Sequence, residues 1–263
     1  MIRNLINHLS ELQASHAVLW QLVRQQLILR YRRTALGYLW TLISPLLMMS
    51  VTAIVFATIF KMSLKNYAVF LFAGMIPWNC FSSIITQSAE SFINNEGLIK
   101  KIYLPKIIFP LSISLGILID SALSFIALFF IIFCIGGQLS WALLFIPIAY
   151  LLLFFFSFGI TLITSIATVF FRDLQHVILI IMQAWFFLTP VMYKNEALAG
   201  GKLAWLVGLN PLVPFIEMFR APLYSATLPG STTIAGAAVL ALGALSIGLL
   251  FFLFQEKKIV FRL

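Results

Sequence analysis

Long apolar runs alternate with short polar segments along this 263-residue chain. A membrane-spanning helix needs about 20 apolar residues, because each residue adds about 1.5 Å and the hydrocarbon layer is about 30 Å thick. Six runs are close to or above this length, over residues 36–60, 67–89, 107–135, 141–170, 176–193 and 233–254. The pattern predicts an all-α membrane protein with six transmembrane helices.

Two other segments have a helical pattern without the character of a span. Residues 16–31, HAVLWQLVRQQLILRY, place apolar side chains near helical spacing and interrupt them with glutamine and arginine. This pattern predicts an amphipathic helix that lies in the membrane interface. Residues 90–106, ESFINNEGLIKKIYLPK, form a loop whose middle could make a short helix that Pro105 would end.

The segment 194–232 is apolar but is broken by Pro211, Pro214 and Pro222, and each half is too short to cross a bilayer. Such a hairpin is typical of a re-entrant structure, which is tolerated only against protein or a water-filled cavity. We therefore expect a single transmembrane domain, residues 1–263, that includes a re-entrant helical hairpin. In the last predicted span, two pairs of small residues four positions apart, Ala237 with Ala241 and Ala244 with Gly248, predict close helix packing.

Composition and charge placement agree with a membrane location. The chain is 62% hydrophobic and 10% charged, with a mean hydropathy of +1.06, whereas a soluble domain is about 45–50% apolar and about 25% charged. Its net charge of +9 could suggest nucleic acid, but the basic residues follow the predicted topology. With the N-terminus inside, twelve of the 17 lysines and arginines lie in inner segments, and five lie in outer segments: Lys61, Lys65, Lys194, Lys202 and Arg220. We therefore expect cytoplasmic N- and C-termini and no nucleic-acid partner.

Little in the chain resembles an active site. The eight acidic residues and three histidines show no metal-ligand spacing, and neither a nucleophile motif nor the phosphate-binding pattern GxxxxGK[ST] occurs. Cys80 and Cys134 lie in apolar stretches and suggest neither a disulfide framework nor a metal site. We therefore expect no catalytic residue, metal or cofactor in this chain, and we expect energy for any work to come from elsewhere.

Two features inside the predicted spans leave alternatives open. Asp120 lies near the middle of the third span, where a charge costs about 2.5–3.5 kcal/mol on insertion scales. It is either a functional carboxyl group or a side chain that faces the helix bundle and bonds a neighbouring hydroxyl. Aromatic residues at the end of the fifth span form either an interfacial belt or a wall that stacks against sugars in a channel: Trp185, Phe186, Phe187 and Tyr193.

Six short motifs carry a family resemblance. They are RYRRTALGYLWTLISPLL (30–47), FAGMIPWNCF (72–81), LIKKIYLPKIIFPL (98–111), FFRDL (170–174), FFLTPVMY (186–193) and LNPLVPF (209–215). In this order and at this spacing they resemble the ABC-2 type permeases that export lipid-linked polysaccharides, among them O-antigen, capsule and teichoic acid. The resemblance covers nearly the whole chain and is greatest to the O-antigen export permeases.

The resemblance implies an assembly and a substrate. Two permease chains would form a homodimer with a channel through the pair in the bacterial inner membrane. Two separate ATPase subunits would bind ATP and magnesium on the cytoplasmic face. The substrate would be a polymer on an undecaprenyl-diphosphate carrier. The interfacial helix would touch the ATPase, residues 194–232 would form a periplasmic hairpin, and the loop around 94–103 would be the gate and coupling region, with Asn95, Glu96, Leu98, Lys100, Lys101 and Tyr103.

The chemistry of arginine suggests a role for the arginines before the first span, in addition to what the resemblance implies. Leu36 and Gly37 resemble the short Leu-Gly loop near the head-group access point of the family, and Tyr38 follows them. Arginine forks bind phosphate oxygens at two points. We hypothesise that the carrier diphosphate binds Arg30, Arg32 and Arg33, while Gly37 permits the turn. Alternatively, these arginines only satisfy the bias of positive charge toward the inner side.

Other functions remain as alternatives. A teichoic acid or capsule exporter is the nearest one. An integral-membrane enzyme that acts on polyprenyl-linked sugars is an alternative from another class. Such an enzyme would need clustered carboxylates, whereas the acidic candidates are scattered along the chain, at Glu90, Glu96, Asp120 and Asp173.

Overall fold

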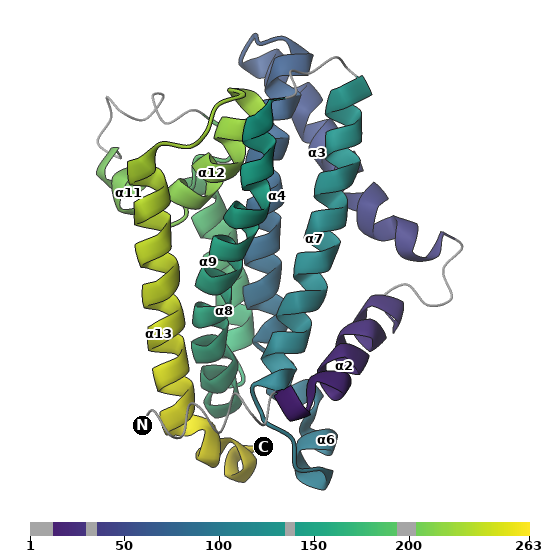
Figure 1. The fold of residues 1–263 in the computed structure, drawn as a ribbon, viewed down its shortest axis with the longest axis vertical. Coiled ribbons are helices and arrows are strands. Elements are labelled where there is room, and N and C mark those ends of the chain that lie inside the picture. The colour runs from purple at the N-terminus through teal and green to yellow at the C-terminus, as the bar shows by residue number, and fades with distance from the viewer. Residues whose placement is uncertain (1–12, 30–35, 135–139, 194–203) are drawn as a thin grey trace.

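The computed structural model describes residues 13–29, 36–134, 140–193 and 204–263, and every regular element within these ranges is a helix (Figure 1). The predicted all-α class is therefore confirmed for this part of the chain. In order, the elements are α2 (His16–Leu29), η1 (Gly37–Leu39), α3 (Trp40–Ile59), α4 (Leu64–Ser88), α5 (Ser91–Asn94), α6 (Glu96–Lys101), α7 (Ile108–Cys134), η2 (Trp141–Phe145), α8 (Ile146–Phe170), α9 (Leu174–Leu188), α11 (Ala204–Leu209), α12 (Val213–Tyr224) and α13 (Ser231–Arg262).

Five helical segments among the described residues are long and apolar enough to cross a membrane, so the protein is a multi-pass membrane protein. They belong to α3, α4, α7, α8 with η2, and α13. The predicted fifth span, 176–193, corresponds to α9, which has only 15 residues and is about 22 Å long. Because that length is below the hydrocarbon thickness, the count of six spans stays a prediction.

The proline-rich segment forms two short helices in its described part, α11 and α12. Pro214 lies in the first turn of α12, where its missing N–H leaves no bond unmade. Pro222 lies inside α12, so the expectation that it breaks the chain there was wrong. The position of this pair of helices relative to a bilayer stays a prediction.

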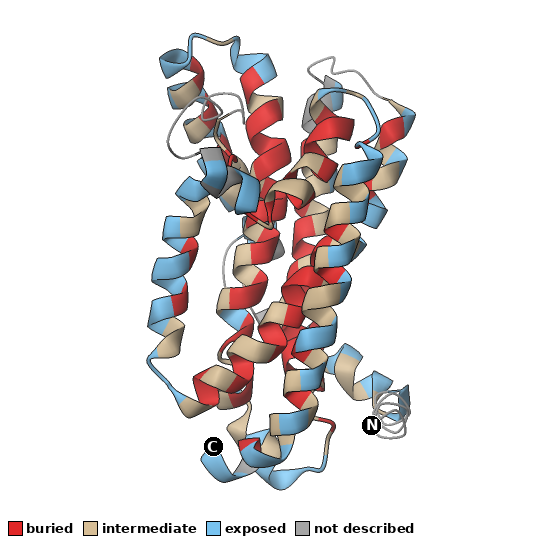
Figure 2. Ribbon diagram, turned by 90° about the vertical axis from the view of Figure 1, so that its left-hand side faces the viewer, coloured by how far each residue is buried: buried red, intermediate tan, exposed pale blue. Residues whose placement is uncertain are grey.

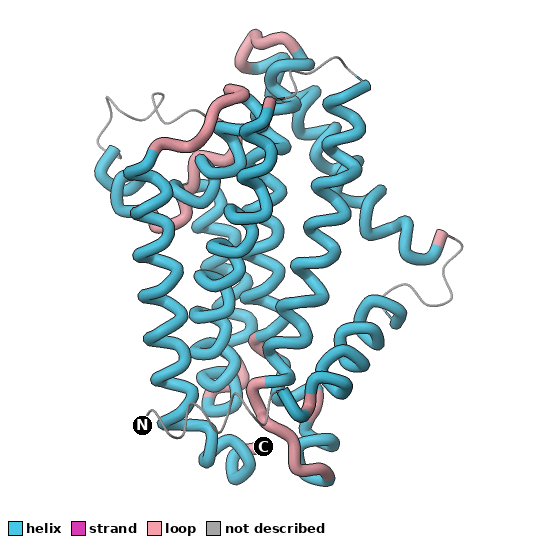
Figure 3. Tube along the Cα trace, viewed as in Figure 1, coloured by secondary structure: helices cyan, strands magenta, loops and turns pink. Residues whose placement is uncertain are grey.

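α4, α7, α8 and α13 run roughly along one axis, whereas α3 is inclined to them, and most of the described loops lie toward the two ends of the bundle (Figures 1 and 3). α6 and the end of α13 lie at one end, and α11 and α12 lie toward the other (Figure 1). Buried residues concentrate in the central helices (Figure 2). In α4, 67% of the spanning residues are buried, against 17% in α3 and 22% in α13. Apolar pattern alone could not make this distinction, since lipid-facing and core residues are equally apolar.

α8 and α13 touch backbone to backbone. A Cβ built on Gly159 would come within 2.3 Å of the Ala244 carbonyl carbon, and one on Gly248 within 2.2 Å of the Gly159 oxygen. Ala237 and Ala241 are also fully buried along α13. The predicted stripe of small residues is therefore confirmed, and its partner is α8. Such close approach gains van der Waals energy, which drives helix association where water is absent.

Arg220 holds the upper end of the bundle together from inside. It belongs to α12 and is only 5% exposed, although the sequence suggested an outer loop. Its Nη2 donates to the carbonyl oxygens of Pro190 at 2.8 Å and Val191 at 3.1 Å. Its guanidinium lies 3.9 Å from the centre of the Phe70 ring. These contacts stabilise the charge inside the protein, and Gly74 leaves the space for it, because a Cβ there would lie 2.9 Å from Nη2.

Two further hydrogen bonds tie distant segments. The Tyr67 hydroxyl on α4 donates to the Met192 carbonyl at 2.8 Å, beside the segment that Arg220 holds. At the opposite end, the Lys106 amine donates to the Glu256 carbonyl at 2.9 Å and joins the start of α7 to α13. Both ends of the bundle are therefore cross-linked by polar contacts.

Replacing either buried glycine by alanine should loosen the contact between α8 and α13. We expect Gly159→Ala and Gly248→Ala each to destabilise the fold by about 1–3 kcal/mol, because the added methyl group forces the two backbones apart. Thermal unfolding of the purified protein in detergent measures this as a lower melting temperature. Gly243→Ala is the matched control on α13, since a Cβ there meets nothing within 4 Å. Equal melting temperatures for all three variants would contradict the close backbone contact between α8 and α13.

Shortening the buried guanidinium should weaken the upper end of the bundle. We expect Arg220→Lys to lower the melting temperature by the equivalent of about 1.5–3 kcal/mol, because an ammonium cannot reproduce the two-carbonyl contact together with the stack on Phe70. Arg172→Lys, on an exposed turn, is the matched control. The same melting temperature for both variants would show that the Arg220 guanidinium does not stabilise the fold.

Candidate functional site

Two cavities lie along α7, and Ile117 and Asp120 line both of them. The first, about 510 Å³, lies among α2, α7 and the α4–α6 region and is called the α2 cavity. The second, about 410 Å³, lies among α3, α4 and α7 and is called the α3 cavity. Because they share two residues on one helix, the cavities are neighbours, and α7 forms a common wall.

Both cavities combine an apolar lining with a number of polar side chains. The α2 cavity is lined by amides and a carboxylate, among them Gln25, Gln26, Gln87, Glu90, Asn94 and Asn95. The α3 cavity has hydroxyl and amide groups, from Ser44, Asn79, Ser83, Ser121 and Ser124, beside methionine side chains. Lipid chains cannot hydrogen-bond such groups, so this lining suits water or a polar ligand.

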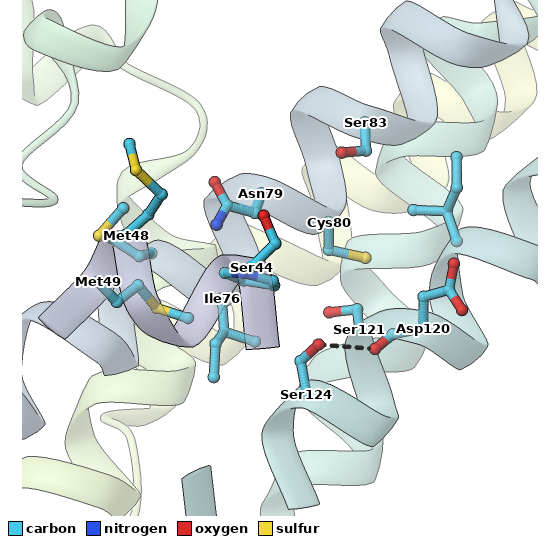
Figure 4. Close-up of a pocket in the computed structure, with 13 residues that line it drawn as sticks. Ser44, Met48, Met49, Ile76, Asn79, Cys80, Ser83, Asp120, Ser121 and Ser124 are labelled. Carbon is cyan, nitrogen blue, oxygen red and sulfur yellow. Dashed lines mark hydrogen bonds between the residues drawn. The ribbon is translucent and has the colours of Figure 1, made fainter. Parts of the chain in front are cut away.

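Asp120 lies on α7, twelve residues after the helix begins at Ile108, or about 18 Å along its axis. Its side chain is 9% exposed. Figure 4 shows it beside Ser121 and Ser124 of α7, across from Asn79, Cys80 and Ser83 of α4. The Ser124 hydroxyl donates to the backbone carbonyl of Asp120 at 2.9 Å. The structure thus places this predicted residue where the two cavities meet.

The structure brings two of the four acidic candidates to one cavity. Glu90 follows α4 at the end of the bundle, and Asp120 lies deep in α7, thirty positions along the chain, yet both line the α2 cavity. The shared cavity is the one relation between these two carboxylates that their positions in the sequence did not indicate. Glu96 and Asp173 lie outside both cavities, and no group of three or more possible metal ligands occurs among the described residues.

The predicted interfacial helix packs against the lower part of α7. Val23 of α2 is fully buried, whereas Trp20 and Ile28 are 62% and 54% exposed, so the helix has an inner face and an outer face on which these apolar side chains flank the exposed Arg24. Its described part ends at Leu29. The predicted diphosphate-binding residues Arg30, Arg32 and Arg33 lie outside the described residues, so the structure does not test that group.

The turn after these arginines has the backbone that the sequence requires. Gly37 has φ +51°, a left-handed conformation that glycine adopts without steric strain. Leu36 beside it is 43% exposed. Tyr38 lies in η1, and its side chain is outside what the structure describes. The turn predicted from Gly37 is therefore present, while its role stays a prediction.

The predicted coupling residues lie at one end of the bundle, on and beside α6 (Figure 1). Lys100 bonds Glu96 at 2.6 Å, and this hydrogen bond and positive charge hold the pKa of Glu96 below its usual value. Asn95 turns inward, since its amide donates to the Ser91 carbonyl at 2.8 Å. Exposed residues make up what we call the α6 surface, which comprises Leu98, Lys100, Lys101, Ile102 and Tyr103.

The four predicted aromatic residues do not share one environment. Trp185 packs edge-on against Phe81, with the ring centres 5.4 Å apart. Phe186 lies against Trp78 at the same separation. Phe187 is 71% exposed, and the Tyr193 hydroxyl donates to its carbonyl at 3.0 Å. Phe187 is thus the member of this group that most clearly leaves a ring free for another molecule.

Sequence reasoning missed Asn210, which organises the end of α9. Its Oδ1 accepts from the Trp185 indole at 3.0 Å and from the Leu212 amide at 3.0 Å. Its Nδ2 donates to the Thr189 hydroxyl at 2.8 Å. The Asn-Pro dipeptide at 210–211 was the available signal, because asparagine before proline favours a turn held by its own side chain.

Known proteins resemble this chain over most of its length. Residues 17–224 match the ABC-2 type transporter family. The O-antigen export system permease protein RfbA of Myxococcus xanthus is 29% identical, over 94% of this chain and 93% of the relative. A protein of the same name from Klebsiella pneumoniae is 32% identical over 79% of this chain and 80% of its own. The polysialic acid transport protein KpsM of Escherichia coli is 24% identical over 88% and 90%.

These matches agree with the helices and motifs described above. The family match includes α2, the first four candidate spans, α9 and α12, and thus nearly all residues of the two cavities and of the α6 surface. The multi-pass helical architecture is what a transporter membrane subunit requires. This protein therefore belongs to the ABC-2 type transporter family.

Proposed function

We propose that this chain is the permease subunit of an ATP-driven exporter that moves a lipid-linked polysaccharide, such as O-antigen, from cytoplasm to periplasm. The observation that carries the proposal is the likeness to O-antigen export permeases, which at 29% identity extends over 94% of the chain. The polymer would travel on undecaprenyl diphosphate. The protein would lie in the bacterial inner membrane with both termini in the cytoplasm and six spans, and α11 and α12 would form the periplasmic re-entrant hairpin.

The apolar outer face of α9 supports a homodimer. α9 buries only Ile178 and Met182, while Val177, Ile180 and Ile181 are 46–66% exposed. A helix about 22 Å long is shorter than the hydrocarbon layer, and packing against a second protein chain relieves such a mismatch. In this arrangement the channel lies between two copies, and Phe187 is the aromatic side chain best placed to face it.

The α6 surface supports a separate ATPase partner that binds ATP and magnesium. Tyr103 is 89% exposed and Ile102 is 52% exposed, beside the exposed cations Lys100 and Lys101. An exposed aromatic ring beside an exposed apolar side chain is typical of a protein-protein contact. ATP binding would shift the gate through its differential affinity for two states of the permease.

Capsule or teichoic acid export is the nearest alternative, and the likeness to KpsM supports the capsule case. The alternative from another class is an enzyme that acts on polyprenyl-linked sugars. Glu90 and Asp120 line the same cavity, and this placement favours the enzyme alternative more than the sequence alone did. The enzyme would transfer sugars without a partner, whereas the exporter subunit needs an ATPase to move its substrate.

Export and partner capture together test the proposal. Removal of the protein from its host should abolish the surface polysaccharide and leave polymer on its lipid carrier inside, as gel analysis of both fractions would measure. The purified protein should carry a stoichiometric ATPase, and Leu98→Cys should crosslink to it. Leu64→Cys is the matched control, because Leu64 is 50% exposed but lies at the end of α4 away from α6. Glycosyl transfer by the lone chain, or full export without any ATPase, would refute the proposal.

The arginines before the first span give a second prediction. We expect the double change Arg32→Gln and Arg33→Gln to reduce export by about tenfold or more, because two-point contacts to the diphosphate are lost. Membrane insertion and ATPase association should remain, as fractionation and co-purification would check. Lys257→Gln with Lys258→Gln, an exposed pair near the end of α13, is the matched control. Normal export by the arginine variant would remove the diphosphate role.

A further inference from the structure

Hydrogen bonds to Asn210 hold the last turn of α9, where apolar packing is limited. Of the residues on α9, only Ile178 and Met182 are buried, and both precede the last turn. Trp185 is partly buried and Phe187 is 71% exposed. The direction of this turn therefore depends on polar contacts as well as on packing.

Asn210 uses its whole carboxamide for this purpose. Its Oδ1 accepts from the Trp185 indole and from the Leu212 amide, both at 3.0 Å. Its Nδ2 donates to the Thr189 hydroxyl at 2.8 Å and to the Leu188 carbonyl at 3.3 Å. The side chain is 7% exposed, and its two donors and both acceptor positions are occupied. Three of the four bonds reach the end of α9.

The other side of this connection is fixed in the protein core. Asn210 lies shortly before α12, whose Phe215 stacks on Phe156 of α8 with the ring centres 4.8 Å apart. Phe219 of α12 meets Tyr150 of α8 edge-on at the same separation. Phe215 and Phe219 are both fully buried, and closely packed ring pairs leave little room for movement. α12 thus gives Asn210 a rigid base.

Phe187 lies inside the turn that Asn210 holds. In the sequence it comes between Trp185 and Leu188, both of which bond Asn210. Its own carbonyl accepts from the Tyr193 hydroxyl at 3.0 Å. Because the direction of a helical side chain follows its backbone, fixing the residues on both sides fixes the direction of the exposed Phe187 ring.

We propose that Asn210 is a positioning residue for the transported glycan: it sets the direction in which Phe187 presents its ring to the polymer. The inference rests on the proposed function, in which Phe187 faces a channel between two copies of the chain. Contacts of an aromatic face, here with the C–H groups of a sugar ring, depend on orientation. In a two-fold symmetric dimer, a displaced α9 end would occur on both sides of the channel.

A spin label reads the position of the α9 end without depending on transport. A nitroxide is attached to Phe187→Cys after Cys80→Ala and Cys134→Ala, and spectra are recorded on the assembled exporter in lipid bilayers. We expect a restricted line shape and a narrow distribution of distances between the labels of the two copies. Asn210→Ala should make the label mobile and broaden the distribution, because the four bonds of the carboxamide are lost.

Milder and matched variants keep this test independent of folding. Thr189→Val removes one bonded hydroxyl but keeps the branched shape, so it should change the line shape in the same direction and to a smaller extent. Asn66→Ala is the matched control, because Asn66 is an exposed asparagine at the same end of the bundle, near the start of α4. Gly159→Ala, which should lower stability at a distance from Asn210, should also leave the line shape unchanged.

Export tests whether Asn210 acts through Phe187. We expect Asn210→Ala and Phe187→Ala each to lower export by about threefold to tenfold, as the loss of one aromatic contact predicts. The double variant should lose no more than the stronger single variant, because both changes remove the same contact. Phe187→Tyr, which keeps the ring, should retain export. Gly159→Ala combined with Phe187→Ala should instead give the product of the two separate effects.

The outcomes separate the inference from the proposed function. A line shape that Asn210→Ala leaves unchanged would overturn the inference, and so would normal export by this variant or multiplied losses when it is combined with Phe187→Ala. Absence of any dipolar signal between labels in the assembled exporter would count against the homodimer of the proposed function instead, while the line shape would still report whether Asn210 holds the end of α9.

Discussion

The contact between α8 and α13 is the interaction on which the rest of the bundle depends. In a bilayer, lipid chains are as apolar as leucine, so burial in protein offers an apolar side chain little advantage. Helices instead gain from close fit, and Gly159 and Gly248 allow two backbones to touch. With one side of α8 taken by α13, α4 and α12 pack on its remaining faces, and α7 and α3 follow α4 outward. The cavities form where this packing ends.

Polar groups inside the bundle serve two different purposes. Arg220 and Asn210 bond to backbone carbonyls and neighbouring side chains and so hold the segment after α9 against α4 and α12. The polar residues around Asp120 instead line open space. Groups of the first kind stabilise the fold through satisfied bonds. Groups of the second kind also bond within the protein, as Ser121 does with Tyr150 and Ser124 with the Asp120 carbonyl, but they lie where a molecule in the cavities would contact them.

Several features were predictable because they depend on local pattern. The long spans follow from apolar length, the turn at Gly37 from glycine next to a helix start, and the stripe on α13 from small residues at helical spacing. Other features were not. Arg220 was assigned to an outer segment because hydropathy does not show that α12 packs into the bundle. The end of α9 at Leu188 was not predictable either, because the apolar run continues beyond it; Thr189 bonds the Trp185 carbonyl and the Asn210 amide there.

The sequence by itself determined the class of protein, since only a membrane can solvate so apolar a chain, and the ordered motifs indicated its family. It also located Asp120 at the middle of a span and the loop around 94–103 between two spans. Tertiary structure alone decided that Glu90 and Asp120 line one cavity, that Trp185 bonds Asn210, and that Phe187 stays exposed. The physical reason is that periodicity reports which side of a helix is apolar, whereas a cavity depends on how distant helices fail to fill the space between them.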